Sequence, residues 1–334
     1  MPGGPEEGGG CAGCGGREGP PGLILVTVDT CRADRVGCYG YPGGGTPTID
    51  ALAADGVVFL DATAPVPLTL PSHCSILTGL YPDRHTVRDN GAERLPAEAE
   101  TLAEILRARG WKTAAFVAAY PLAREFGTDQ GFTVYNDEFT SNAGGTESLA
   151  AEGQGDLASR LFYDERTAGD VVDAALPWLR EAVAGEEPYF LWLHFFDPHF
   201  AYRPPARHAA AGRHPYDGEI FFVDEQLARV TAELGEDRRR VTWVVTADHG
   251  ESLLEHGLAE HGYLYDDNLM VPLIVALPGG AHNGRRIPQQ VRLVDVAPTL
   301  FELAGLAIPA GIDGASLLPL VAGTDGVQSR PAWS

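Results

Sequence analysis

Three short apolar segments of the sequence are each followed by side chains that could bind a metal ion or transfer a proton. These side chains belong to Asp29, His194, His199, Asp248 and His249. Open α/β sheets place their ligand sites at the carboxyl ends of strands, so side chains at such ends meet at one edge. Carboxylates mixed with imidazoles suit zinc or manganese better than magnesium, which prefers oxygen ligands alone. The positions therefore predict a divalent-metal site at the edge of a sheet.

Thr69 is the candidate nucleophile, because it precedes a helix that we expect from about Ser72 to Thr78. The free N–H groups and dipole of a helix start favour a tetrahedral anion at that point. A threonine hydroxyl is a weak nucleophile until metal coordination lowers its pKa. Taken alone, Thr69 is more simply a helix cap, and Asp29 is typical of a cap for the helix after its strand. Asp248-His249 alone could equally form a turn.

The segments that must position these residues alternate between strands and helices. Apolar runs predict buried strands at Leu23–Val28, Thr113–Val117, Tyr189–Leu193, Val241–Thr246 and Leu273–Ala276. Amphipathic patterns predict helices at Ile49–Ala54, Thr101–Arg109, Thr167–Val183, Gly218–Leu234 and Val296–Leu303. This alternation predicts an α/β fold, a three-layer sandwich with a mostly parallel central sheet.

Two stretches lack these patterns. Residues 1–22 are rich in Gly, Pro and Glu and predict a disordered tail ahead of a single catalytic domain over residues 23–334. A Cys-x-x-Cys pair in that tail has no second pair, so unpaired thiols are favoured over a zinc site. Asn136 to Gly155 is Gly- and Ser-rich, which predicts a surface excursion.

The charge limits the partners of the protein. The 334 residues include 46 acidic and 24 basic residues, for a formal net charge of -22, which disfavours nucleic acid and anionic membranes. A small anionic substrate must therefore be held by a local positive feature. The sequence has neither a membrane-spanning apolar run nor a signal peptide, and it does not indicate an oligomeric state. Localisation stays open, with the periplasm or the cell exterior as alternatives for a chain whose N-terminus is incomplete.

Several short motifs follow one another between Leu23 and Leu320. They are Leu25-Val26-Thr27-Val28-Asp29-Thr30, Thr69-Leu70-Pro71-Ser72-His73, Leu77-Thr78-Gly79-Leu80-Tyr81-Pro82, Arg88-Asp89-Asn90, Asp248-His249-Gly250-Glu251, Glu255-His256-Gly257, His261-Gly262 and Val294-Asp295-Val296-Ala297-Pro298-Thr299. As an ordered set they resemble the sulfatase family of the alkaline phosphatase superfamily. The resemblance implies an alkaline-phosphatase-like fold. Family members continue into a smaller antiparallel sheet, so we expect either a short form or a chain whose C-terminal subdomain is missing.

The resemblance also implies roles for individual residues. It implies that the ligands of a core divalent metal are Asp29, Thr69, Asp248 and His249. Zinc or manganese is favoured for this site, with calcium as an alternative. Thr69 occupies the position of the nucleophile and would be catalytic.

Four further positions match residues that contact substrate in the family. His73 and Asn90 would bind the substrate anion, His73 in place of the family's arginine. His199 and His261 would be catalytic, either by protonating the leaving group or by binding a second metal. Glu251 could orient a metal-bound imidazole.

The departures from the sulfatase pattern concern the nucleophile. Sulfatases oxidise a Cys or Ser in a C/S-x-P-x-R motif to formylglycine, whereas oxidation of Thr69 would give a ketone. Cys74 lacks the following Pro and Arg, and the family's active-site lysine is absent because Lys112 is the single lysine. A hydroxyl nucleophile beside a metal and extra histidines resembles phosphatases, phosphodiesterases and phosphoethanolamine transferases.

The leading hypothesis is therefore a metal-dependent hydrolase that cleaves sulfate or phosphate esters through Thr69, with the residues favouring phosphoester chemistry. One alternative is transfer of a phosphoethanolamine-type group to an acceptor other than water. The other is a metal-binding module without catalytic activity. The absence of the family's arginine and lysine would be consistent with this alternative.

Overall fold

A computed structural model describes residues 22–141, 164–280, 282–324 and 329–332 of the chain. Eight strands form its central sheet, in the order β12-β2-β11-β8-β1-β7-β3-β4. They are β1 (Gly22–Val28), β2 (Val57–Thr63), β3 (Lys112–Phe116), β4 (Val134–Asn136), β7 (Tyr189–Phe195), β8 (Val241–Thr246), β11 (Met270–Ala276) and β12 (Arg285–Arg292). Two small ribbons pair β5 (Thr140–Ser141) with β6 (Asp164–Glu165), and β9 (Ser252–Leu253) with β10 (Ala259–Glu260).

The sheet is mostly parallel, as the sequence predicts. Strands β8, β1, β7, β3 and β4 pair in parallel, and β11 runs against both of its neighbours. Every residue of β1, β7 and β8 is buried, which suits strands covered on both faces. Because these three strands are parallel neighbours, their carboxyl ends lie together at one edge of the sheet.

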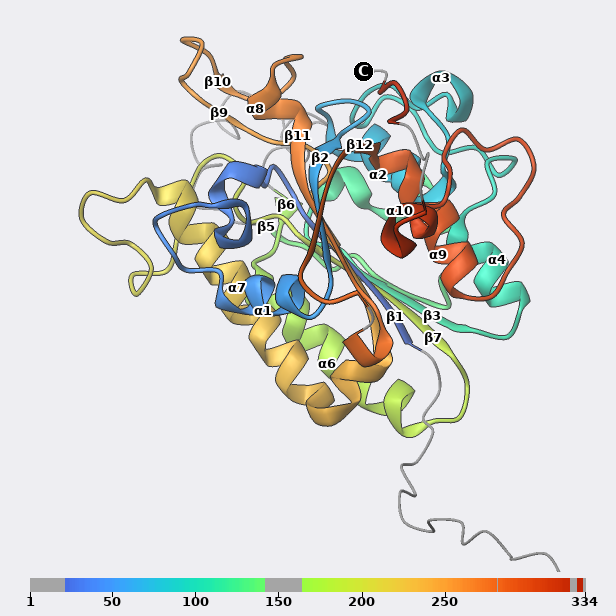
Figure 1. Ribbon diagram of the computed structural model, residues 1–334. Helices are drawn as coiled ribbons and strands as arrows, with labels where there is room; N and C mark the ends of the chain where they lie inside the picture. The colour runs from blue at the N-terminus through green and yellow to red at the C-terminus, as the bar shows by residue number, and fades with distance from the viewer. Residues whose placement is uncertain (1–21, 142–163, 281, 325–328, 333–334) are drawn as a thin grey trace, which may run out of the picture.

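Helices cover both faces of the sheet and complete three layers (Figure 1). One face carries α1 (Pro47–Ala54), α6 (Ala168–Ala184) and α7 (Pro215–Leu234), and the other carries α2 (Thr69–Thr78), α4 (Leu102–Ala108) and α9 (Val296–Leu303). Short helices are α3 (Pro82–His85), α8 (Asp266–Leu269) and α10 (Leu318–Ala322). Short 3-10 segments occupy Ala33–Arg35, Gly37–Tyr39, Tyr120–Leu122, Arg124–Phe126, Gly235–Arg240, Pro278–Gly280 and Leu293–Asp295. Within the described residues, no helix combines the length and apolar character needed to cross a bilayer.

The structure refines several expectations from the sequence. All five predicted strands and all six predicted helices are present, most with ends shifted by a few residues, but β2, β4 and β12 of the central sheet were missed. Helix α2 begins at Thr69 itself and not near Ser72, since Pro71 is compatible with a first helical turn. The predicted tail at residues 1–22 lies outside the described residues except for Gly22, which belongs to β1. The predicted surface excursion also falls largely outside them.

Candidate active site

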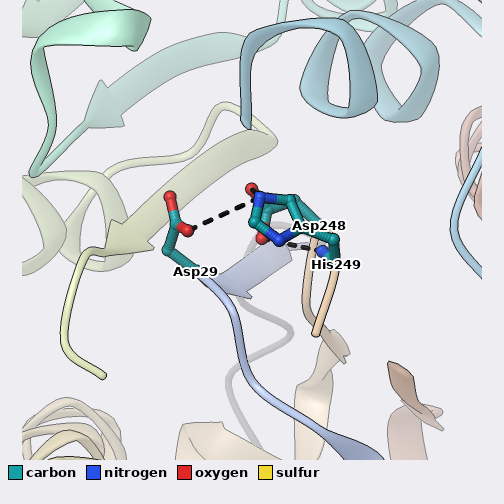
Figure 2. Close-up of side chains that lie close together, drawn as sticks. All are labelled: Asp29, Asp248 and His249. Carbon is teal, nitrogen blue, oxygen red and sulfur yellow. Dashed lines mark hydrogen bonds and ion pairs between the residues drawn. The ribbon is translucent and has the colours of Figure 1, made fainter. Parts of the chain in front are cut away.

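Three predicted metal ligands converge where β1 and β8 end. Asp29 directly follows β1, and Asp248 and His249 follow β8 after one intervening residue (Figure 2). His249 Nε2 lies 3.3 Å from Asp248 Oδ2 and 3.8 Å from Asp29 Oδ1. One ligand atom from each residue lies within 4.8 Å of the other two, and all three side chains are buried. The structure therefore brings together three of the four predicted ligands at the ends of two neighbouring strands.

Hydrogen bonds leave one atom of each residue without a partner. His249 Nδ1 lies 3.0 Å from the Gly250 carbonyl and must donate to it, so Nε2 keeps a free lone pair. Asp248 Oδ1 accepts the backbone N–H groups of Thr30 and His249, whereas Oδ2 has no partner. Asp29 Oδ1 and His249 Nε2 are likewise buried and unpartnered. Buried polar atoms are rarely left unpaired. Three unpaired oxygen and nitrogen atoms that converge on one point therefore fit the ligands of a bound divalent cation.

His194 orients Asp29 for this role. The N–H of Ala118 donates to His194 Nδ1 at 3.1 Å, which places the ring proton on Nε2. That N–H faces Asp29 Oδ2 at 3.3 Å and leaves Asp29 Oδ1 free. An outer residue that fixes a ligating carboxylate is typical of metal sites.

The electrostatics of the site favour a cation. Burial raises the pKa of Asp29 well above its ordinary value, and the charges of Asp248 and Glu251 raise it further. Burial likewise raises the pKa of Asp248, while it lowers that of His249. Two carboxylates in one buried space cannot both ionise readily at neutral pH without a compensating charge. A divalent cation would supply that charge.

Thr69 lies beside the predicted metal ligands at the start of α2. Its side chain is buried. Its hydroxyl lowers the pKa of Asp29, whereas burial raises that pKa, so the hydroxyl lies close to the Asp29 carboxylate. The Ser72 hydroxyl, one helical turn later, donates to the Asp248 carbonyl at 2.7 Å and holds α2 against the end of β8. The predicted nucleophile and the three ligands therefore share one buried space.

His73 lies beneath Thr69 and uses both ring nitrogens within the protein. The Trp192 indole N–H donates to Thr27 Oγ1 at 2.9 Å, and that hydroxyl lies 3.0 Å from His73 Nε2. His73 Nδ1 in turn lies 2.7 Å from the Thr69 carbonyl, to which it donates. Burial lowers the pKa of His73 to about 4, so the ring is neutral. His73 therefore supports the backbone of Thr69, whereas the sequence predicts a substrate contact.

Asn90 contacts the same helix start from outside. Its Oδ1 accepts the N–H of Leu70 at 2.8 Å, which occupies one of the free donors of the first turn. Asn90 is partly exposed, so it lies at the rim of the site that the sequence predicts for the substrate anion.

His199 and His261 extend the site away from the metal ligands. The ring centroid of His261 lies 4.5 Å from that of His249 and 5.0 Å from that of His199. The His199 Nδ1–H donates to the Phe200 carbonyl at 2.6 Å, and burial lowers the pKa of His199 to about 3. Within the described part of the chain, these two histidines do not form a second cluster of three ligand atoms, so the second metal stays a prediction.

Glu251 is a buried carboxylate next to His261. Its Oε1 lies 3.6 Å from His261 Nδ1, and neither carboxylate oxygen has a hydrogen bond. Burial raises the pKa of Glu251, and the nearby His261 ring acts in the opposite direction. The sequence indicated Glu251 as an orienting residue for a metal-bound imidazole, and the structure places it beside His261 instead. Trp192 and Thr27 could not be recognised from the sequence, because only the fold shows that they connect to His73.

Comparisons with known proteins identify the family of the chain. A family model described as Sulfatase matches residues 21–306. Human arylsulfatase A is 28% identical over 352 residues, which cover 91% of this chain and 68% of that protein. The Delta 4,5-hexuronate-2-O-sulfatase of Bacteroides thetaiotaomicron is 26% identical over 356 residues, which cover 93% of this chain and 74% of that protein.

Solved structures share the fold. The phosphonate monoester hydrolase of Agrobacterium radiobacter superposes with a TM-score of 0.73 at 23% identity, covering 94% of this chain and 79% of that one. A protein in complex with its substrate D-glucosamine-2-N,6-O-disulfate gives 0.74 at 20% identity, covering 94% and 82%. Because the family model covers most of the chain, and the central sheet has the fold of the solved sulfatases, this protein belongs to the sulfatase family of the alkaline phosphatase superfamily, a family of sulfuric ester hydrolases.

Proposed function

We propose that the protein hydrolyses sulfate monoesters with Thr69 as nucleophile at a divalent-metal site. The observation that carries this proposal is the set of three unpartnered donor atoms on Asp29, Asp248 and His249, in the same buried space as the Thr69 hydroxyl. Thr69 would be the fourth ligand. A cation held there would lower the pKa of the Thr69 hydroxyl and polarise the ester oxygens.

The residues of the chain then divide the reaction between them. Thr69 Oγ1 releases its proton to solvent and attacks sulfur while the bond from sulfur to the ester oxygen breaks, which leaves a sulfated Thr69 and an alkoxide that takes up a proton. The Trp192–Thr27–His73 chain of hydrogen bonds fixes the Thr69 carbonyl and therefore its backbone. Water then attacks sulfur, and cleavage of the bond from Thr69 to sulfur releases sulfate and restores the hydroxyl.

The departing alcohol oxygen needs a proton, and we assign its delivery to His261. The buried Glu251 carboxylate lies 3.6 Å from His261 Nδ1 and can pair with a cationic ring. His199 is neutral because burial disfavours its charged form. With Nδ1–H bonded to the Phe200 carbonyl, His199 presents Nε2 as a hydrogen-bond acceptor near the same alcohol.

Phosphorus esters are a second candidate class of substrate. Thr69 cannot become formylglycine, whose hydrate offers a second hydroxyl, so a threonine ester must be cleaved by water. Phosphate esters suit that chemistry, and a structural neighbour is a phosphonate monoester hydrolase. Transfer to an acceptor other than water would use the same nucleophile.

Four substrates separate these functions: the 4-nitrophenyl esters of sulfate, phosphate and phenylphosphonate, and bis(4-nitrophenyl) phosphate. We expect turnover of the sulfate, its loss on chelation and its absence in Thr69→Ala. Equal amounts of nitrophenol and inorganic sulfate would show hydrolysis, whereas a deficit of sulfate would show transfer. Faster turnover of a phosphorus ester would favour the second class. If the folded, metal-loaded protein turns over none of the four substrates, the result would support a metal-binding module without catalytic activity.

A further inference from the structure

His261, the proton donor proposed above, directly follows a very short β-ribbon. The ribbon pairs β9 with β10 over two residues on each strand, and β10 ends at Glu260. It projects from the main sheet, and Leu254 at its turn is exposed (Figure 1). A two-stranded ribbon of this length is not stable by itself in water. Contacts outside the ribbon must therefore fix the position of His261.

Arg32 connects this ribbon to the segment that follows the predicted metal ligand Asp29. Its side chain is 8% exposed. The guanidinium Nη1 donates to the Glu251 carbonyl at 3.1 Å and to Glu255 Oε1 at 2.5 Å. Nε and Nη2 donate to the two carboxylate oxygens of Asp34 at 2.9 and 2.7 Å. The rigid, planar guanidinium therefore bridges the segment after β1 and the segment that contains β9.

The two acceptors of Arg32 Nη1 lie on either side of β9. Glu251 precedes the strand, and its side-chain Oε1 lies 3.6 Å from His261 Nδ1. Arg32 therefore fixes the backbone of the residue whose carboxylate faces the proton donor. Glu255 Oε2 accepts the N–H of Leu253 at 2.7 Å, so the Glu255 carboxylate joins Arg32 to the end of β9.

Asn268 on α8 provides a second, uncharged anchor for the ribbon. The residue is fully buried, and its Oδ1 accepts the N–H of Tyr263 at 3.0 Å. Its Nδ2 donates to Ser252 Oγ at 2.9 Å, and its carbonyl accepts the N–H of Gly250 at 2.8 Å. These bonds fix the chain before β9 and after His261, while Arg32 fixes the carboxylate and the backbone on which His261 depends.

We propose that Arg32 is a positioning residue that holds the β9–β10 ribbon, and with it His261, beside the predicted metal ligand His249. The proposal rests on the function proposed above, in which His261 protonates the departing alcohol. The carboxylates of Asp34 and Glu255 are 60% and 36% exposed, and exposed ion pairs add little stability, which favours positioning as the role of these contacts. Misplacement of a reacting group by about 1 Å costs up to about 100-fold in rate.

The leaving group of the substrate separates positioning from general stability. Phenoxide needs a proton as it departs, whereas 4-nitrophenoxide leaves readily without one. The ratio of kcat/KM for phenyl sulfate to kcat/KM for 4-nitrophenyl sulfate therefore measures proton delivery. In Arg32→Gln this ratio should fall about tenfold, toward the ratio of His261→Ala. Arg32→Lys keeps the charge without the planar group and should restore part of it.

Two further variants make the test specific. Arg292→Gln is the matched control, because Arg292 is also 8% exposed and also binds both carboxylate oxygens of an aspartate, Asp295. It lies on β12, and its variant should keep the wild-type ratio. Glu255→Gln changes the partly exposed partner of Arg32, so it weakens the same contact with less risk to folding. It should also lower the ratio, and it decides alone if Arg32→Gln does not fold.

Hydrogen exchange measured by mass spectrometry tests the anchor without turnover. Amide exchange over residues 251–263 should be faster in Arg32→Gln and Glu255→Gln than in the wild type, with β1 and β8 unchanged, and Arg292→Gln should leave these residues unchanged. That result in a protein that turns over no ester would support the positioning role while refuting the proposed function. The proposal is overturned if the folded variants exchange like the wild type over residues 251–263. It is also overturned if active variants lose both kcat/KM values equally.

Discussion

At the scale of single residues, the site depends on which atoms are already satisfied. The Gly250 carbonyl fixes the tautomer of His249, and the Ala118 N–H fixes that of His194. The consequence is that Asp29 Oδ1 and His249 Nε2 both face the metal position with free lone pairs. The residue types in the sequence predicted a metal site, whereas only the fold shows which atom of each residue remains available.

Asp29→Asn should therefore remove the metal. The amide carries no charge and would lose the ion pairing that offsets burial of the cation. We expect the metal content, measured by inductively coupled plasma mass spectrometry, to fall by more than tenfold. Asp83→Asn, which changes an exposed aspartate of α3, is the matched control and should keep its metal. Full metal content in Asp29→Asn would exclude Asp29 as a ligand.

At the scale of elements, α2 is joined to the sheet through polar contacts that pass under the nucleophile. Thr27 lies within β1 and Trp192 within β7, and both reach His73 on α2 through one hydroxyl. The Ser72 hydroxyl makes a second connection, to the end of β8. These contacts fix where the first turn of α2 lies relative to the metal ligands.

Thr27→Val should reduce catalysis by displacing Thr69. The change removes the hydroxyl between two buried polar groups, and each unpaired group costs about 1–3 kcal/mol. We expect kcat to fall about tenfold or more with a smaller change in KM, because Thr27 does not contact substrate. Thr27→Ser restores the hydroxyl and should recover most of kcat. Failure of the serine variant to recover it would assign the loss to general destabilisation.

His85 gives a prediction about stability within α3. Its Nε2–H lies 3.0 Å from Ser75 Oγ, while Nδ1 accepts the N–H of Val87 at 3.2 Å, and burial lowers its pKa to about 4. The unfolded chain takes up a proton near pH 6.5 and the folded protein near pH 4, so the free energy of unfolding falls as pH falls between these values. By linkage, this one group contributes at most about 3 kcal/mol.

His85→Gln should therefore flatten the decline in stability between pH 6.5 and 4. The measurement is urea unfolding of wild type and variant across that range. Parallel curves for the two proteins would show that His85 is not the titrating group. His256, which is exposed and stacks on Tyr265, offers a matched control in His256→Gln, whose curve should follow that of the wild type.

The elements differ in how well the sequence predicts them. The buried strands β1, β7 and β8 are continuous apolar runs and were predicted. Strand β12 was missed because it is a polar edge strand containing Pro288, and a proline in such a run argues against a strand unless it lies at an edge. In β2, Leu60 is exposed and Asp61 follows it, which hides the apolar pattern.

At the scale of the whole molecule, parallel strands bring together residues that lie more than 200 positions apart. Asp29 and Asp248 meet because β1 and β8 are adjacent and parallel. The sequence predicted this convergence for Asp29, Thr69, Asp248 and His249. It could not predict the direction of His73, since the face of a helix that meets the sheet depends on the packing of the complete domain.

Metal removal should destabilise the whole domain, and more so at high pH. The pKa values of Asp29 and Asp248 are raised in the folded protein, so without metal the folded state loses stability as pH rises above the unfolded values near 4. A bound cation favours the ionised forms. If the free metal concentration is about 100 times its Kd, chelation with EDTA should lower Tm by roughly 5 °C at pH 8. At pH 5 the decrease in Tm should be smaller. An equal shift at both pH values would contradict this coupling.

The central claim is that Thr69 itself becomes covalently attached to the substrate's anion during turnover. Acid quenching during turnover of a sulfate ester, followed by peptide mass spectrometry, measures this directly. The account predicts a sulfated peptide whose modification maps to Thr69 and is absent from Thr69→Ala. A protein that turns over the ester with Thr69 unmodified throughout, or with the sulfate on another residue, would contradict the account.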